Sequence, residues 1–122
     1  MARILLLEED KSLRDLIQLF SQDEGYEIVA VQNITQALRE ARRTTFDLIV
    51  RDSLAMTPEQ FFQAPDPLLA LPSRPPILVL TGHALDPQRL RALGYAGVIQ
   101  KPFDIEDLGD ALRRVLGEET PG

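Results

Sequence analysis

The chain has 122 residues, which is the size of one domain. Hydrophobic residues make up 44% of the sequence and charged residues 26%, enough for an apolar core and a soluble surface. The net charge of -6 argues against a surface that binds nucleic acid or an anionic membrane. Because the chain has no cysteine and one histidine, disulfides, thiolate metal sites and histidine-rich zinc sites are excluded.

The apolar runs are short. None approaches the roughly 20 residues needed to span a bilayer, and the apolar stretch near Met1 is too short for a signal peptide. We therefore expect a cytoplasmic protein with no membrane contact. We expect one domain over residues 1–117 and a flexible tail over residues 118–122, without internal repeats or low-complexity segments.

Five short apolar runs are each followed by polar residues. Runs of this length are typical of strands that are buried on both faces of a sheet. The third run ends directly in an acid, Asp52, with no turn residue before it. The expected strands are residues 4–7, 27–31, 48–52, 77–80 and 97–100.

Helical spacing of apolar residues follows four of these strands. In the first helix Ser12 is the expected N-cap and Gly25 the stop, and the inward residues are expected to be Leu13, Leu16, Ile17 and Phe20. Asn33 is expected to cap the second helix. A later helix is expected over residues 85–93, with Pro87 tolerated in its first turn and Gly94 as its stop. The last helix opens at Asp104.

Residues 57–76 contain six prolines. Because proline inside a helix costs about 3 kcal/mol, a long helix is not expected here. Short helical turns are expected over residues 58–63 and 67–71, followed by a loop. Strands that alternate with helices at these lengths predict a doubly wound α/β fold with a parallel sheet between two helical layers.

Polar residues stand at the carboxyl ends of four of the strands. Residues 8–10 are all acidic and follow the first strand, and Asp52, Thr81 and Lys101 end or follow the third, fourth and fifth. In an open parallel sheet these ends share one edge, where ligands bind. Carboxylates suit a hard cation such as Mg2+, and a carboxylate beside it can attack a phosphoryl group. The acids at this edge should raise one another's carboxyl pKa values.

Four motifs lie at these strand ends: Ile-Leu-Leu-Leu-Glu-Glu-Asp, Phe-Asp-Leu-Ile-Val-Arg-Asp, Ile-Leu-Val-Leu-Thr-Gly and Gln-Lys-Pro-Phe-Asp. In this order and spacing the chain resembles the receiver domain of two-component response regulators over residues 3–117. The resemblance implies a flavodoxin-like fold, with five parallel strands in the order 2-1-3-4-5 and helices on both faces.

The resemblance also implies a site. Asp52 matches the residue that accepts a phosphoryl group from a histidine kinase or phosphotransfer protein. Glu8 and Glu9 match the acidic pair that holds Mg2+, together with Asp52 and the main-chain carbonyl of Leu54. The domain would be a signalling switch without a metabolic substrate, possessing only self-phosphorylation and dephosphorylation chemistry.

Further positions match the switching parts of the family. Thr81 matches the switch hydroxyl, and Lys101 matches the lysine that contacts phosphate and precedes a cis proline, here Pro102. Leu54 and His83 stand where side chains tune dephosphorylation. The resemblance further implies an output domain or target protein, and the last helix and its neighbours as the surface of a weak dimer.

The chain departs from the family pattern at several positions. Glu9 replaces the usual aspartate, and Val98 stands where the family carries an aromatic switch. Met56 and Gln60 replace a proline and a glycine of the loop after Asp52. These departures favour a second hypothesis, a degenerate receiver that binds partners without phosphorylation, whereas Asp52 and its polar neighbours favour a phosphorylated switch.

Arg51 is unusual within an apolar strand. Its long side chain could reach solvent while its stem stays buried, or it could pair with an acid. The sequence leaves both alternatives open.

Overall fold

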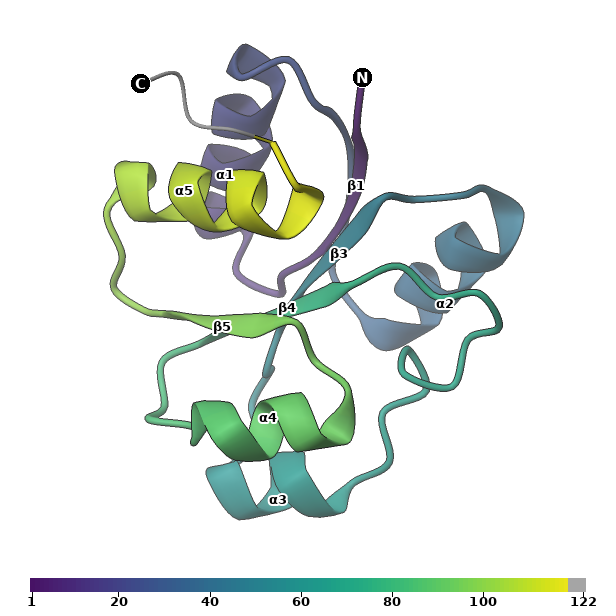
Figure 1. The fold of residues 1–122 in the computed structure, drawn as a ribbon, viewed down its shortest axis with the longest axis vertical. Helices are drawn as coiled ribbons and strands as arrows, with labels where there is room; N and C mark the ends of the chain where they lie inside the picture. The colour runs from purple at the N-terminus through teal and green to yellow at the C-terminus, as the bar shows by residue number, and fades with distance from the viewer. Residues whose placement is uncertain (119–122) are drawn as a thin grey trace.

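The computed structural model describes residues 1–118, which form a five-stranded sheet between two layers of helices (Figure 1). The tail expected over residues 118–122 lies outside the described residues except for Glu118. The strands are β1 (Arg3–Leu7), β2 (Glu27–Val31), β3 (Leu48–Asp52), β4 (Ile77–Thr81) and β5 (Gly97–Gln100). The helices are α1 (Lys11–Asp23), α2 (Ile34–Arg43), α3 (Pro58–Gln63), α4 (Pro87–Leu93) and α5 (Ile105–Leu116).

All neighbouring strands are parallel, and their order is β2-β1-β3-β4-β5. The fold class and strand order expected from the sequence are therefore confirmed. The register places Leu7 beside Arg51 and Asp52 beside Leu80, so the chain leaves β1, β3 and β4 at one edge of the sheet. This edge gathers the polar residues that follow the strands.

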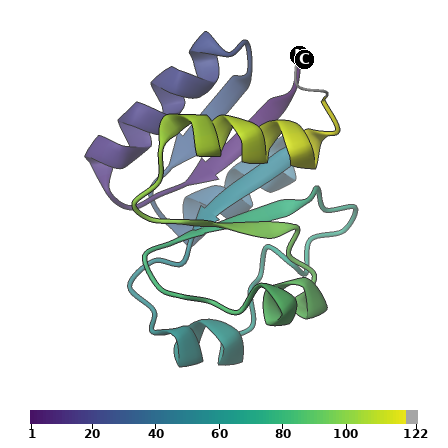
Figure 2. The ribbon, with the colours of Figure 1, turned by 60° about the vertical axis from the view of Figure 1, so that its left-hand side comes forward.

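Helices cover both faces of the sheet, as Figures 1 and 2 show. Helices α1 and α5 pack on one face, over a core that includes Leu6, Val50 and Leu80. Helices α2, α3 and α4 pack on the other, over a core that includes Leu5 and Ile49. Because side chains alternate along each strand, Asp52 and the residues next to it in sequence belong to opposite faces.

The start of α1 differs from the expectation. The N-cap is Asp10, not Ser12, and its carboxylate accepts hydrogen bonds from the main-chain N–H groups of Ser12 and Leu13. Asp10 has the extended backbone that an N-cap requires, so α1 begins at Lys11, whereas a cap at Ser12 would have placed its first residue at position 13. Leu16, expected to face the core, is 51% exposed. The C-terminal stop is as expected, because Gly25 has a φ of 92°.

The proline-rich segment forms the short elements that the sequence predicts. Helix α3 starts with a capping box between Thr57 and Gln60, and residues 67–70 form a hydrogen-bonded turn. Helix α4 begins at Pro87 instead of Leu85, because Asp86 is the N-cap and proline is well suited to the first helical position. Within residues 1–118, no helix is long and apolar enough to cross a membrane.

Candidate functional site

Asp52 is the last residue of β3 and lies almost buried at the polar edge of the sheet, with 4% of its surface exposed. Glu8 follows β1, the neighbouring strand, and is fully buried. A carboxylate in such surroundings requires a compensating charge or hydrogen bonds. The structure supplies both.

Lys101 joins the two carboxylates. Its Nζ donates to Glu8 Oε1 at 2.8 Å and to Asp52 Oδ1 at 3.1 Å. Its main-chain N–H donates to the carbonyl of Thr81 at 2.7 Å, which fixes the end of β5 against β4. The Lys101–Pro102 peptide bond is cis, as the sequence predicts. We call Glu8, Asp52 and Lys101 the edge cluster.

The pKa values in the edge cluster reflect burial and pairing. Burial raises the pKa of the Glu8 carboxyl, and the hydrogen bonds from Lys101 and from the Asp10 N–H offset only part of this effect. The charge of Asp52 also raises the pKa of Glu8, as we expected of neighbouring acids, but burial is the larger cause. Burial by itself lowers the pKa of Lys101. The hydrogen bonds and charges of Glu8 and Asp52 together outweigh burial, so the pKa of Lys101 lies above its ordinary value.

The second acid of the pair lies apart from the edge cluster. Glu9 is exposed, and its carboxylate makes no hydrogen bond or ion pair within residues 1–118. Arg14 holds the turn instead, because its Nη1 donates to the carbonyl oxygens of Glu8 and Glu9 at 2.9 and 3.4 Å. In the part of the chain that the structure describes, no three His, Asp or Glu side chains form a group that could hold a metal ion.

Thr81 ends β4 and is fully buried. Its Oγ1 lies 2.9 Å from Ser53 Oγ and accepts a hydrogen bond from the main-chain N–H of His83 at 3.0 Å. Ser53, itself buried, was missed in the sequence. The sequence did contain a signal for it, because Ser53 is a small hydroxyl residue directly after the acid that ends a buried strand. A side chain at that position lies close to the end of the next strand.

The remaining predicted positions surround this edge. Leu54 has a φ of 62°, a left-handed conformation that is rare for a leucine. His83 is exposed in the loop after β4. Val98 is half-buried beside Val79 and packs on the core under α4, so it occupies the expected aromatic position without a ring.

Arg51 is paired with an acid, which decides between the two alternatives that the sequence leaves open. Its Nη1 lies 2.8 Å from Asp66 Oδ2, and both side chains are buried, with 3% and 5% exposed. Asp66 Oδ2 also accepts a hydrogen bond from the Tyr95 hydroxyl at 2.6 Å. The guanidinium lies over the ring of Phe61, 5.3 Å from its centroid. We call Arg51, Asp66 and Tyr95 the inner cluster.

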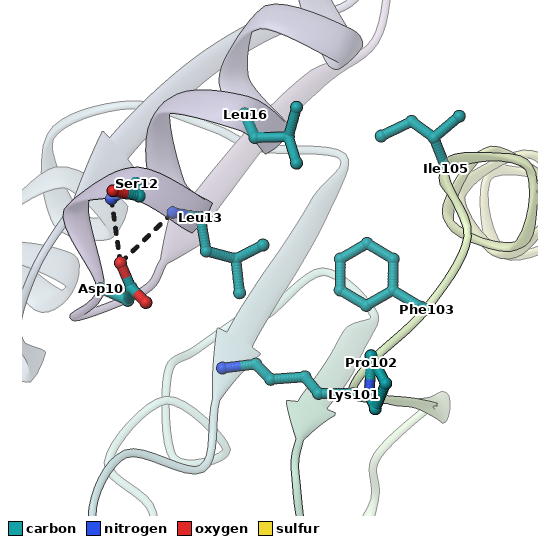
Figure 3. Close-up of a pocket in the computed structure, with 8 residues that line it drawn as sticks. All are labelled: Asp10, Ser12, Leu13, Leu16, Lys101, Pro102, Phe103 and Ile105. Carbon is teal, nitrogen blue, oxygen red and sulfur yellow. Dashed lines mark hydrogen bonds between the residues drawn. The ribbon is translucent and has the colours of Figure 1, made fainter.

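An apolar groove of about 810 Å³ opens beside Lys101 (Figure 3). Across this groove, Leu13 and Leu16 of α1 face Ile105, the first residue of α5, and Phe103, two positions before it. Its lining explains why Leu16 is exposed: α1 turns this side chain toward the groove instead of toward the sheet. An exposed apolar surface next to a polar site is typical of a protein-binding surface.

Comparison with known proteins agrees with the geometry. The sequence family of the response regulator receiver domain matches residues 4–113. The transcriptional regulatory protein GlrR of Escherichia coli (strain K12) is 28% identical over 98% of this chain. The chain spans 27% of the length of GlrR and 57% of the length of the probable transcriptional regulator ycf29 of Porphyra purpurea, which is 26% identical.

Solved structures show the same likeness. The chemotaxis response regulator CheY4 of Vibrio cholerae has a TM-score of 0.76 and 31% identity, with 94% of this chain and 98% of that chain covered. The receiver domain of the sensor histidine kinase PA1611 of Pseudomonas aeruginosa PAO1, described with a magnesium ion in its active site cleft, has a TM-score of 0.76 and 27% identity, covering 96% and 98%. The resemblance found in the sequence is thus confirmed, and the chain belongs to the response regulator receiver domains of two-component signalling.

Proposed function

We propose that Asp52 accepts a phosphoryl group from a phosphohistidine of a histidine kinase or phosphotransfer protein. The observation that carries this proposal is the edge cluster, in which one ammonium lies within hydrogen-bond distance of both buried carboxylates. In the reaction an oxygen of the Asp52 carboxylate attacks phosphorus, the phosphorus–nitrogen bond of the donor breaks, and the imidazole leaves with its electron pair and takes a proton. The product is an acyl phosphate on Asp52.

The residues around Asp52 suit the charge of that product. Phosphorylation adds negative charge and strong acceptor oxygens. Lys101 retains its positive charge because its pKa is raised, and the Thr81 hydroxyl can donate to a phosphoryl oxygen. Transfer of this kind depends mainly on positioning and on charge stabilisation.

The donor set also fits Mg2+. Two buried carboxylates at one edge, a third on the adjacent exposed residue and a main-chain carbonyl are oxygen ligands of the kind this ion takes, alongside several waters. Glu8, Glu9, Asp52 and the carbonyl of Leu54 would hold it, with Glu9 rotating from solvent or acting through water. When bound, the ion supplies positive charge for the phosphoryl oxygens.

The experiment is incubation of the chain with acetyl phosphate and Mg2+, followed by mass spectrometry. The wild-type protein should gain the mass of one phosphoryl group, and Asp52→Asn should gain none. Beryllofluoride should bind the wild-type protein only. If neither reagent modifies or binds the wild-type protein, the degenerate receiver is the better hypothesis.

The lifetime of the acyl phosphate should depend on Leu54, since its side chain offers no hydrogen bond that could position an attacking water. Leu54→Asn should accelerate dephosphorylation and should also fold well, because asparagine tolerates the left-handed conformation found here. An unchanged decay rate would contradict this role. His83→Ala, at the other expected position, tests whether that exposed side chain contributes.

The groove beside Lys101 is the surface where we expect the phosphodonor to dock, because Lys101 of the edge cluster lines it. Leu16→Glu should abolish phosphorylation by a histidine kinase and leave phosphorylation by acetyl phosphate intact. Equal loss with both donors would argue against docking here.

Three further expectations stay predictions. Activation should change the surroundings of Val98 little and those of residues 82–85 more, which amide chemical shifts with and without beryllofluoride would measure. A weak dimer through α5 would appear in sedimentation, and a cytoplasmic location in fractionation of the source cells.

A further inference from the structure

Two hydroxyl groups are buried against each other beside the site. Ser53 Oγ and Thr81 Oγ1 are 2.9 Å apart, and neither residue exposes more than 2% of its surface. The main chain fixes both partners, because the Ser53 N–H donates to the carbonyl of Leu80 at 2.9 Å and Thr81 lies in β4. The pair therefore has a defined geometry.

Both acceptor lone pairs of the Thr81 hydroxyl are occupied in this arrangement. A hydroxyl has one proton and two acceptor lone pairs. The main-chain N–H of His83 can only donate, so it occupies one lone pair of Thr81. The Ser53 hydroxyl donates to the other lone pair and has no other hydrogen-bond partner among residues 1–118, so the proton of the Thr81 hydroxyl stays available for a phosphoryl oxygen. The buried Ser53 hydroxyl thus depends on Thr81 as its hydrogen-bond acceptor.

We propose that Ser53 is a positioning residue that holds the Thr81 hydroxyl in its unphosphorylated place and so opposes the activated conformation. The inference rests on the proposed phosphorylation of Asp52. A phosphoryl group there attracts the Thr81 hydroxyl toward its own oxygens. Thr81 then leaves Ser53, whose hydroxyl stays in a site that excludes water.

The cost of activation follows from that loss. A buried hydroxyl that loses its partner is destabilised by its full desolvation penalty. Val98, which pairs on β5 with Val79 two positions before Thr81, has a short β-branched side chain with no ring that could turn into the vacated space. Ser53 therefore shifts the conformational equilibrium toward the resting state. A residue without the hydroxyl at this position should shift the equilibrium back toward the activated state.

Ser53→Ala removes the hydroxyl and little else. In the wild-type chain the Ser53 bond must be broken on activation, whereas alanine has no bond to break. The half-saturating concentration of beryllofluoride, at constant Mg2+, should fall about tenfold in Ser53→Ala. Ser53→Cys keeps the size and a weak donor, so its value should lie between those of the wild type and Ser53→Ala.

The chain offers a matched control. Ser21 on α1 is equally buried, and its hydroxyl has no partner within the described residues. Ser21→Ala should therefore leave beryllofluoride binding unchanged. A double-mutant cycle completes the design: in a Thr81→Ala background, Ser53→Ala should have no effect on the half-saturating concentration.

The titration is followed by the amide signals of Gly82 and His83 in the full chain, with melting curves for every variant. A lower half-saturating concentration in Ser53→Ala, lost in the Thr81→Ala background, supports the inference. An unchanged or higher concentration in Ser53→Ala, while the wild type binds normally, overturns it and leaves the proposed function standing. Absence of binding in the wild type and all variants overturns both.

Discussion

Two ionic clusters lie on either side of β3. Asp52 belongs to the edge cluster, and its neighbour Arg51 belongs to the inner cluster. In the edge cluster, the Lys101 side chain remains 24% exposed, although the side chains of Glu8 and Asp52 are only 0% and 6% exposed. In the inner cluster, Arg51 and Asp66 are both at least 95% buried, and they contact Phe61 of α3 and Tyr95 of the loop before β5. The clusters differ in access to solvent more than in composition.

This difference indicates different roles. A cluster that solvent reaches can exchange its ammonium contacts for a cation or a phosphoryl group. A closed cluster can change only by unfolding locally, because its charges depend on one another for stability. Arg51 of the inner cluster also donates a hydrogen bond from Nε to the main-chain carbonyl of Asp52 at 3.0 Å. The inner cluster therefore helps to hold the backbone of Asp52 in place.

The largest effect should follow from Asp66→Ala. The substitution leaves the Arg51 guanidinium buried without its counter-charge, which should lower the free energy of unfolding by about 3–5 kcal/mol. Urea denaturation measures it. The matched control is Asp110→Ala, which removes a surface partner of Arg113 and should cost less than about 1 kcal/mol. Equal costs for both would mean that the inner cluster is not closed.

A smaller effect is expected from Tyr95→Phe. This change keeps the ring against Phe61, whose centroid is 5.6 Å away, and removes only the hydroxyl bond to Asp66. Hydrogen bonds to a charged group contribute about 1.5–3 kcal/mol, so the loss should lie near the lower end because Arg51 and the Leu68 N–H still hold Asp66. A loss as large as that of Asp66→Ala would show that Tyr95 also positions Arg51.

Lys101→Met tests the edge cluster in the same assay. Because the lysine is 24% exposed and Glu8, whose pKa is already raised, can take up a proton, the free energy of unfolding should fall by less than it does in Asp66→Ala. Added Mg2+ should stabilise Lys101→Met more than it stabilises the wild type, because the substitution leaves two carboxylates without their ammonium partner. A loss that Mg2+ does not restore would contradict the proposed metal ligands.

The smallest effect near neutral pH concerns the two tyrosines. Burial, aided by Glu118, raises the pKa of Tyr26 from 10.0 to about 12, and burial with the Asp66 hydrogen bond raises that of Tyr95 further. A phenol with a raised pKa stabilises the fold fully below pH 10, and this contribution is lost as the pH rises through the folded value.

We therefore expect no tyrosinate absorbance in the folded protein near pH 10, and a loss of stability that begins above it. In Tyr95→Phe this alkaline loss should be smaller, because only Tyr26 remains to ionise. Tyrosinate absorbance with a midpoint near 10 in the wild type would show that neither phenol is protected.

The sequence alone determined the elements that depend on local patterns. Short apolar runs set the five strands, glycine and asparagine set helix ends such as those at Gly25 and Asn33, and alternation of strands with helices set the parallel sheet. Parallel strands bring their carboxyl ends to one edge, so the proximity of Glu8, Asp52 and Lys101 followed from order and length. Local patterns did not decide which of two neighbouring residues caps α1. The N-cap is Asp10, although Ser12 was expected.

Only the tertiary structure decided which polar groups share a buried space. Ser53 meets Thr81 from 28 positions away, and Asp66 meets Tyr95 from 29 positions away. Asp66 lies in a segment without regular structure, whose path depends on how α3 packs over the sheet. Because a buried charge or hydroxyl must find its partner wherever the packed chain places one, the partner of Arg51 is a property of the fold as a whole.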